Sequence, residues 1–569
     1  MLAFAKFFDR SSRAKAIPDS RAQRTLPPTR SAPFAPGRAL LAILAPMASG
    51  ALVGQLFIAG GIPQVAWVCL VPLTWSMKTD HRGVEVYIGA YLGGVLAGWL
   101  TLDFLRSAVS GRFEPHWYLA GYCLGFLWLA AVFSARLVLR RIQLPMAVLL
   151  PMIWLCFDHI QQMLIAFFVK EQPCSLNKLG LTQIEHSHLV QIADLFGIDG
   201  VTWLVVSANG LIADLAWPAR FTEVRLYRWT AALLFLFPLA GAYGYGHWCL
   251  SKPMSREHCE VGIISGRVAE RFEELARQFH SDLSAIRAKS PEFHDVDLIV
   301  LSEDACGELR LSADNPSIRE SRFSAEMAPI AKDLSSSLIV GVAIKDTLAN
   351  IDSNSVLYFT PSGGYSGRYD KNHLGPGTES QTTLGRLVGS RGGEFWKISP
   401  KAPGGSETRP GNHVAVFQTE SDEGAQRFFG VAICFDVFFP EVFGRYMKGS
   451  GAKAPPQFFV HCADEFIAGS NRFAHLSFAC VRFRAIETRR AFIRSCSSGI
   501  SGVVDSCGRT LVSRPTGRDF SGDFIAQSVP LDDRFSAYLL FGDALSRLCC
   551  VGTGVLVCIT RYWQCRAGK

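Results

Sequence analysis

The stretch from Ala39 to Met77 contains no charged side chain, and it limits how this chain can fold more than any other feature. It is too long for one helix across a hydrocarbon core of ~30 Å, which needs about 20 apolar residues. The sequence GGIP at 60–63 divides it, because Gly and Pro interrupt helices. The stretch therefore predicts two consecutive membrane-spanning helices.

Further apolar stretches predict more spans before residue 252, seven in all with the first two. They are Tyr87–Leu102, Trp117–Ala135, Leu144–Val169, a segment around Gly200–Ala213, and Trp229–Leu250. An eighth, shorter span is predicted at 548–560, where Arg547 and Arg561 would extend toward the interfaces. The composition, 49% hydrophobic and 19% charged, agrees with a large membrane part.

The net charge of +8 does not predict nucleic-acid binding, because the basic residues are concentrated in particular loops. They lie in the N-terminal tail and in the second, fourth and sixth connections, which carry KTDHR, RLVLRR and RFTEVRLYR. By the positive-inside rule these segments are cytoplasmic, which places the domain after the seventh span outside the cytoplasm. The predicted parts are a basic cytoplasmic tail (1–37), a seven-helix membrane domain (38–251), an extracytoplasmic domain (252–535) and a C-terminal span with a short cytoplasmic tail (536–569).

Residues 252–535 have a different pattern, in which short β-branched runs alternate with amphipathic helices. Strands are predicted at 261–266, 296–303, 336–344, 354–364, 413–420, 427–436 and 456–464. Helices are predicted over 271–289 and 472–490, where apolar residues recur at helical spacing. This alternation predicts an α/β domain.

Three chemically different side chains, Glu303, Lys371 and Cys434, each follow a predicted strand. Reactive groups in α/β sheets tend to lie just past the carboxyl ends of strands. A carboxylate can take the thiol proton, and an ammonium group can stabilise the thiolate and then an oxyanion. The backbone N–H after the cysteine would be a second oxyanion donor. The alternatives are a cysteine that only fills the core and three unrelated residues, because any α/β domain offers many strand ends.

Sixteen cysteines do not predict a disulfide framework, because most lie in apolar stretches where they act as small hydrophobic side chains. The extracytoplasmic segment holds seven, an odd number, so at least one of them is unpaired within it. No Cys/His spacing of the zinc type is present, and neither a metal nor a cofactor is expected.

The same residues carry a family resemblance. The domain with Glu303, Lys371 and Cys434 resembles the nitrilase (carbon–nitrogen hydrolase) superfamily. With its membrane part, the chain from about residue 39 resembles the bacterial apolipoprotein N-acyltransferases. The motifs are QIADLFGIDGVTWLVVSANGLIAD (191–214), RYDKNHLGPGTE (368–379), RAIETRRAFIRSCSSGISGVVDSCGRT (484–510) and LLFGD (539–543).

The resemblance implies a four-layer αββα sandwich on a multi-span helical domain in the bacterial inner membrane. It implies that a phospholipid acyl chain passes to Cys434 as a thioester and then to the α-amino group of a diacylglyceryl-cysteine at a lipoprotein N-terminus. Glu303 would be the base, Lys371 the oxyanion stabiliser and Glu379 an additional active-site carboxylate. The stretch 382–412 would form a lid over the acyl pocket, or else a solvated Gly-rich loop. Its possible lipid contacts are Leu384, Leu387, Phe395 and Trp396.

The chain departs from the family pattern at three places. Phe435-Asp436 stands where the family usually has Tyr-Glu after the nucleophile, so that the role of the shorter acid is open. The sequence DEFIA (464–468) replaces Asn-Asp-Ala-Trp-Phe, which removes an aromatic side chain near the substrate site. QPC (172–174) replaces Phe-Pro-Trp. These changes concern substrate preference more than chemistry.

Two further polar residues are expected to have structural roles. Asp158, in a predicted span, is expected to form a helix–helix hydrogen bond rather than to act in catalysis, with Gln161 and Gln162 as possible partners. A structural hydrogen bond is likewise expected for His373. Two other functions stay open at this point: a membrane-tethered amidase of the same superfamily, and a non-catalytic lipid-binding homologue.

Overall fold

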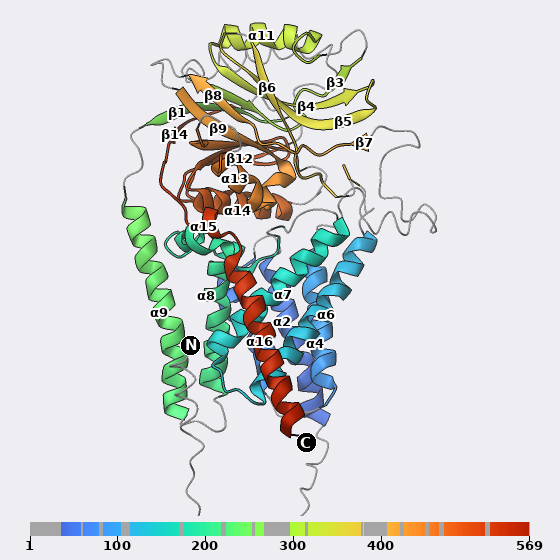
Figure 1. Cartoon of the computed structure of the whole chain (residues 1–569), viewed down its shortest axis with the longest axis vertical. Helices are drawn as coiled ribbons and strands as arrows, with labels where there is room; N and C mark the ends of the chain where they lie inside the picture. Colours follow the sequence, from blue (N-terminus) through green and yellow to red (C-terminus); the bar gives the residue numbers. More distant parts are fainter. Residues whose placement is uncertain are drawn as a thin grey trace, which may run out of the picture.

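The computed structural model has a helical half and a β-rich half, stacked along the long axis of the molecule (Figure 1). It describes residues 36–57, 61–78, 83–103, 114–169, 174, 176–217, 224–252, 257–266, 296–312, 317–362, 364–376, 379–380, 407–420, 426–449, 454–465, 471–517 and 524–567. The N-terminal tail through residue 35 and the helix predicted at 271–289 lie outside these residues.

The helical half consists of long apolar helices that run roughly side by side (Figure 1). They are α2 (Pro36–Leu56), α3 (Val71–Lys78), α4 (Glu85–Thr101), α6 (Glu114–Leu139), α7 (Met146–Val169), α8 (Ala193–Ala216), α9 (Val224–Ser251) and, from the end of the chain, α16 (Ala544–Ala567). Small residues allow close packing, as helices in lipid require. A Cβ on Gly50 of α2 would come 2.1 Å from the carbonyl oxygen of Gly93 on α4.

Among the described residues, five helical segments are long and apolar enough to cross a membrane. They are Gly37–Leu56, Trp117–Leu139, Met146–Phe167, Leu189–Ala216 and Ala544–Arg566. Helices α4 and α9 occupy two more of the predicted spans. The other predicted span contains the short 3₁₀ helix η2 (Pro63–Trp67) and the eight-residue α3, with Pro63 as the first residue of η2 and Pro72 as the second residue of α3. The count of seven spans before residue 252 stays a prediction.

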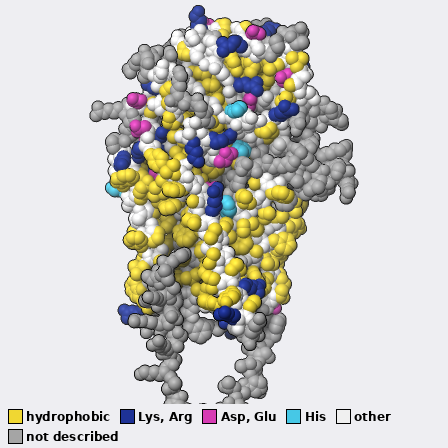
Figure 2. Space-filling view, in the orientation of Figure 1, with side chains coloured by type: hydrophobic (Ala, Val, Ile, Leu, Met, Phe, Trp, Pro, Cys, Tyr) yellow, Lys and Arg dark blue, Asp and Glu magenta, His cyan; other side chains and the backbone are white. Residues whose placement is uncertain are grey.

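The surface of the helical half suits a hydrocarbon environment. Figure 2 shows hydrophobic side chains over most of this half, with Lys and Arg near its lower end and over the β-rich half. Large apolar side chains such as Phe126 and Phe237 are 63% and 82% exposed. Water-facing surfaces rarely carry apolar patches of this extent, and a surface of this kind fits the hydrocarbon region of a bilayer.

The β-rich half is a sandwich of two sheets. One is eight-stranded: β1 (His258–Ile264), β2 (Leu298–Leu301), β3 (Glu308–Leu311), β4 (Ser337–Asp346), β5 (Ile351–Phe359), β6 (Tyr365–Asp370), β7 (Glu407–Thr408) and β14 (Phe524–Pro530). The other is six-stranded: β8 (Val416–Glu420), β9 (Gln426–Ile433), β10 (Phe458–Ala463), β11 (Ala491–Cys496), β12 (Gly499–Val504) and β13 (Thr510–Thr516). The strands that meet at the active site, β2 and β9, have parallel neighbours and are almost entirely apolar.

Helices cover both outer faces of the sandwich, which gives the four layers αββα (Figure 1). Helix α11 (Arg322–Leu334) buries Phe323, Met327 and Ile330 against the first sheet, at the spacing of one helix face. Helices α13 (Pro440–Met447) and α14 (Asn471–Thr488) cover the second sheet, and α14 lies between the sandwich and the helical half. The predicted fold class is confirmed.

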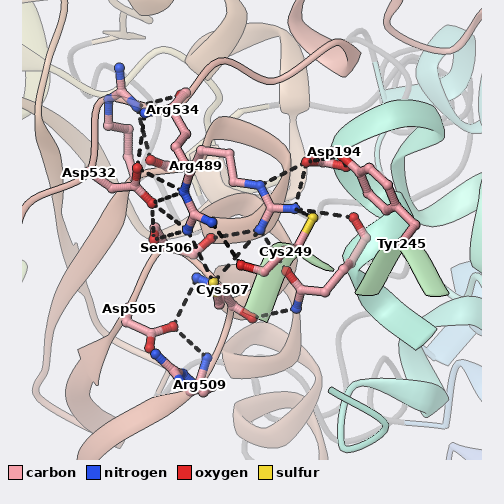
Figure 3. A network of polar contacts seen from close by, with 12 residues as sticks. Asp194, Tyr245, Cys249, Arg489, Asp505, Ser506, Cys507, Arg509, Asp532 and Arg534 are labelled. Atoms are coloured by element: carbon pink, nitrogen blue, oxygen red, sulfur yellow. Dashed lines mark hydrogen bonds and ion pairs between the residues drawn. The ribbon is translucent and has the colours of Figure 1, made fainter. Parts of the chain in front are cut away.

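The two halves share one hydrophobic core and a buried polar network. The core includes Leu189 and Val201 of the helical half together with Val431 and Phe478 of the sandwich. Figure 3 shows the polar network, in which Arg489, just after α14, reaches Asp194 at the start of α8. The sandwich is therefore packed onto the membrane helices and not joined to them by a linker alone.

Candidate active site

Cys434 lies where β9, the strand next to the edge strand β8, ends. It is the first residue of a 3₁₀ turn, η8 (Cys434–Phe438), so that the strand predicted over 427–436 ends earlier, at Ile433. Its φ of 45° is in the left-handed region, which costs a non-glycine residue of order 1–3 kcal/mol. Such strain is found where the surroundings impose it, commonly at functional sites, and it argues against a cysteine that only fills the core.

Glu303 and Lys371 are brought into direct contact from two strands of the other sheet. Glu303 lies two residues beyond β2, and Lys371 directly follows β6. The Lys371 Nζ is 2.9 Å from Glu303 Oε1 and 2.8 Å from Glu379 Oε2. The Lys371 and Glu303 side chains are only 3% and 7% exposed, so the ion pairs lie in a medium of low dielectric constant.

Asn354 on β5 completes this cluster, and the sequence alone did not single it out. Its Nδ2 donates to Glu303 Oε1 at 2.6 Å and to Glu379 Oε1 at 2.7 Å. Asn354 and Lys371 therefore each bridge the same two carboxylates. The remaining oxygen of Glu303 accepts the N–H of Asp464 at 2.7 Å, which fixes the carboxylate in one orientation. The sequence held one signal for Asn354: it is a polar residue in a strand whose last four residues are apolar.

The side chain of Asp436 connects the cysteine turn, residues 434–438, to the loop that follows Lys371. Its carboxylate accepts the N–H of Ile433 at 3.0 Å, the N–H of His373 at 2.8 Å and the hydroxyl of Tyr369 at 2.8 Å. Asp436 is fully buried, and both of its carboxylate oxygens accept hydrogen bonds. The aspartate is shorter than a glutamate but still joins the two loops. The neighbouring Phe435 ring packs against Phe438 and Phe439, with centroids 5.4 and 5.3 Å apart.

The predicted structural residues have the expected partners. His373 Nε2 lies 2.7 Å from Glu441 Oε1, and its ring stacks on Phe439 at 3.8 Å. Asp158 Oδ2 accepts from Gln162 Nε2 at 3.2 Å. The Asp158–Gln162 bond lies within α7 and does not join two helices. That the two residues have structural and not catalytic roles stays a prediction.

The suggested lid residues Leu384, Leu387, Phe395 and Trp396 lie outside the described residues. The membrane side of the site is described, however. Arg472 at the start of α14 donates to the carbonyl oxygens of Leu100 and Thr101 at 2.5 and 3.3 Å, at the carboxyl end of α4. Phe473 packs on Phe438 of the cysteine turn, with centroids 5.6 Å apart. The candidate nucleophile is thus seated close to the ends of the membrane helices.

The electrostatics of the cluster favour a protonated thiol next to a base. Burial raises the pKa of Cys434 well above its ordinary value, and the charge of Glu303 raises it further, while Lys371 acts in the opposite direction. Burial also raises the pKa of Glu303, which makes it a better proton acceptor. Burial alone would lower the pKa of Lys371, but the negative charges of the Cys434 thiolate when it forms, and of Glu303 and Glu379, raise it well above its ordinary value, so the cation persists.

Alkylation of Cys434 by iodoacetamide is therefore expected to accelerate from neutral pH through about pH 9, the ordinary pKa of a thiol, without levelling off. A raised pKa means that the thiol is protonated at neutral pH and that the fraction of reactive thiolate increases with pH. Peptide mass spectrometry at a series of pH values measures the rate, and Cys434→Ala gives the background. A plateau already reached at neutral pH would indicate a preformed thiolate and contradict this.

The described residues contain no group of three or more His, Cys, Asp or Glu side chains arranged to hold a metal ion. All sixteen cysteines are free thiols. Cys434, Lys371, Glu303 and Glu379 supply a thiol, an ammonium group and two carboxylates at this site.

The family model "Carbon-nitrogen hydrolase" matches residues 234–522, more than half of the chain. The chain belongs to the carbon–nitrogen hydrolase family. The model "Apolipoprotein N-acyltransferase N-terminal domain" matches residues 49–211, in the helical half. The two models together identify the apolipoprotein N-acyltransferase branch of this family.

Relatives match over nearly the full length. The apolipoprotein N-acyltransferase of Geobacter metallireducens is 24% identical over 540 residues, which are 91% of this chain and 94% of that protein. That of Haemophilus influenzae is 24% identical over 493 residues, 83% of this chain and 82% of the relative. Among solved structures, the nitrilase-superfamily protein Nit3 of Saccharomyces cerevisiae aligns with 49% of this chain and 92% of its own, at 16% identity and a TM-score of 0.34.

Proposed function

We propose that this chain is an apolipoprotein N-acyltransferase that moves a phospholipid acyl chain, through a thioester on Cys434, to the N-terminal amine of a lipoprotein. The observation that carries the proposal is a strained thiol at the end of β9, close to the ends of membrane helices. Its Sγ lies 3.7 Å from the carbonyl oxygen of Asp464, the residue whose N–H binds Glu303 of the Glu303–Lys371 pair. A thiol, a base and an oxyanion donor are the parts that acyl transfer requires.

In the first step the Cys434 thiol gives its proton to Glu303, and the sulfur attacks the ester carbonyl of the donor lipid. The carbonyl oxygen becomes an oxyanion, which the Lys371 ammonium group and the backbone N–H of Phe435 stabilise. The N–H of Phe435 is in the first turn of η8, where amides have no partner within the helix. Collapse breaks the ester bond, and the leaving alkoxide takes the proton back from Glu303, leaving an acyl-enzyme and a lysophospholipid.

In the second step the α-amino group of a diacylglyceryl-cysteine attacks the thioester. Glu303 takes a proton from the nitrogen, and the same two donors stabilise the second oxyanion. Collapse breaks the C–S bond, the thiolate regains a proton, and an amide is formed. Glu379 does not touch the reacting atoms in this scheme. Its carboxylate, which Asn354 orients, holds Lys371 in place. Burial alone would raise the pKa of Glu379, but the charge of Lys371 together with hydrogen bonds from Asn354, Lys371 and the Gly375 N–H lowers it.

The same proposal places the sandwich on the outer side of the bacterial inner membrane, with both termini in the cytoplasm. The support is the excess of Lys and Arg in alternate loops of the helical half. In that position the enzyme meets both phospholipids and exported lipoproteins. Acyl chains then reach the thiol from the bilayer, where Arg472 and Phe473 join the cysteine turn to α4, without crossing water.

The decisive experiment is peptide mass spectrometry of the protein purified with native phospholipid. We expect a hydroxylamine-labile acyl adduct on Cys434 that is absent in Glu303→Gln, because the amide cannot take the thiol proton. Glu308→Gln is the matched control, since Glu308 is a half-exposed carboxylate on β3 that pairs with Arg310 and Lys345 away from the thiol.

The two alternative functions give different outcomes of the same measurement. A bare Cys434 in folded protein with lipid present, together with hydrolysis of small amides, would indicate a membrane-tethered amidase. A bare thiol without any turnover would indicate a lipid-binding homologue. An adduct that remains unchanged in Glu303→Gln would remove Glu303 from the base role while leaving acyl transfer in place.

A further inference from the structure

His461 lies directly behind the candidate nucleophile and takes no part in the scheme above. It is on β10, the parallel neighbour of β9, and is fully buried. Its Nε2 is 3.0 Å from the carbonyl oxygen of Cys434, and its Nδ1 is 2.8 Å from Nη1 of Arg494 on β11. A buried imidazole thus links a buried guanidinium group to the backbone of the cysteine.

These two contacts determine which ring nitrogen of His461 carries the proton. A guanidinium group can only donate hydrogen bonds, so Nδ1 must accept from Arg494 and must be unprotonated. The single ring proton is then on Nε2, which donates to the carbonyl oxygen of Cys434. Burial and the positive charge of Arg494 lower the pKa of His461 well below its ordinary value, so the ring stays neutral.

Arg494 is itself held from several sides. It forms a buried ion pair with Glu465, and its Nε donates to the carbonyl oxygen of Ile500 at 2.9 Å. Its Nη1 also lies 3.2 Å from the hydroxyl oxygen of Ser477. The charge of the guanidinium group is balanced by Glu465, which lies in the DEFIA stretch where the chain departs from its family. The position of the imidazole is therefore fixed by a complete set of contacts.

The carbonyl of Cys434 and the N–H of Phe435 belong to one peptide unit. That unit is planar and trans, so its C=O and N–H point in opposite directions. A hydrogen bond that holds the C=O toward β10 consequently aims the N–H at the opposite side. The strained φ of 45° at Cys434 makes such a restraint necessary, because the left-handed conformation is not favoured by the residue itself.

We propose that His461 is a positioning residue that orients the oxyanion-stabilising N–H of Phe435, with Arg494 and Glu465 setting its tautomer. The inference rests on the proposed acyl transfer. It predicts a rate effect on thioester formation that exceeds any effect on stability or lipid binding, because a misdirected N–H weakens only the interaction formed in the transition state.

Two substitutions separate this role from ordinary packing. In His461→Asn the amide lies near the place of Nδ1 and still accepts from Arg494, but it does not reach the carbonyl of Cys434. In His461→Gln the amide extends about as far as Nε2 and can restore that donor. We expect single-turnover thioester formation to fall by about 10–100-fold in the Asn variant with unchanged KM for lipid, and the Gln variant to recover most of the rate.

Infrared spectroscopy detects the hydrogen bond from the Phe435 N–H directly. With a phospholipid that carries a ¹³C-labelled ester carbonyl, the infrared C=O band of the acyl-enzyme should shift to higher frequency in His461→Asn and return in His461→Gln, because a well-aimed N–H lowers it. Ser495→Ala is the matched control. Ser495 is the next residue on β11, and its buried hydroxyl donates to a different backbone carbonyl, that of Ile264, at 2.9 Å.

The possible outcomes distinguish this inference from the proposed function. Equal rates and equal band positions in the Asn and Gln variants overturn the positioning role. A rate of thioester formation that decreases in parallel with the melting temperature in both variants overturns it as well, since His461 would then be a packing residue. If the wild-type protein forms no thioester at all, acyl transfer itself is wrong.

Discussion

Lys371→Met is expected to reduce thioester formation by about 10³-fold, the upper range for loss of one oxyanion donor. The reason is that Lys371 acts in two ways. It supplies a donor to the oxyanion, and it neutralises Glu303 and Glu379, which it bridges at 2.9 and 2.8 Å. Without the cation, two buried carboxylates face each other and one takes up a proton, so that Glu303 is also a weaker base. Single-turnover acylation followed by mass spectrometry measures the effect.

Lys371→Arg is the control for charge. It keeps the positive charge but replaces a compact ammonium group by a planar fork, which cannot occupy the same position between the two carboxylates and an oxyanion. We expect intermediate activity. If the Lys371→Met and Lys371→Arg variants lose the same activity, the position of the donor matters more than its charge. If Lys371→Met retains more than a tenth of the wild-type rate, Lys371 does not stabilise the oxyanion.

The candidate site could be predicted in part because reactive side chains follow strands. Glu303, Lys371 and Cys434 were each identifiable from a buried strand followed by a polar or reactive residue. That rule does not give the direction of side chains within a strand. Asn354 and His461 lie inside β5 and β10, and whether such residues face the site depends on the register between strands, which a single sequence does not contain.

The departure at DEFIA shows a second limit. In the sequence it looked like the loss of an aromatic side chain near the substrate. The structure shows that Glu465 forms a buried ion pair with Arg494, which in turn contacts His461. The partner is 29 residues away along the chain and comes from the neighbouring strand. An interaction of this kind becomes visible only when the sheet pairing is known.

The α/β domain was predictable for a different reason: its strands are short, apolar and separated by helical patterns, so the alternation is strong. The assignment of strands to two sheets was not, because β8 to β13 form one sheet in chain order while the last strand, β14, returns to pair with β1 in the other sheet. In the helical half, apolar length located the helices. It did not show that the second predicted span contains a 3₁₀ helix followed by the eight-residue α3.

The junction between the two halves carries the second large expected effect. Arg489 donates from Nε and Nη2 to Asp194 Oδ2 at 2.8 and 2.5 Å, and the Tyr245 hydroxyl on α9 donates to the same carboxylate (Figure 3). The side chains of Arg489 and Asp194 are 1% and 4% exposed. Breaking a buried pair by removing one partner leaves an uncompensated charge, which costs about 3–5 kcal/mol.

Asp194→Ala is accordingly expected to lower the free energy of unfolding by about 3–5 kcal/mol, measured by denaturation in mixed micelles. Adding Arg489→Met should recover much of this loss, because no charge is then left buried. Glu308→Ala, which breaks a solvent-exposed pair with Arg310, is the matched control and should cost at most about 1 kcal/mol. If Asp194→Ala costs no more than this control, or if the double variant is less stable than Asp194→Ala alone, the ion pair does not hold the sandwich on the membrane helices.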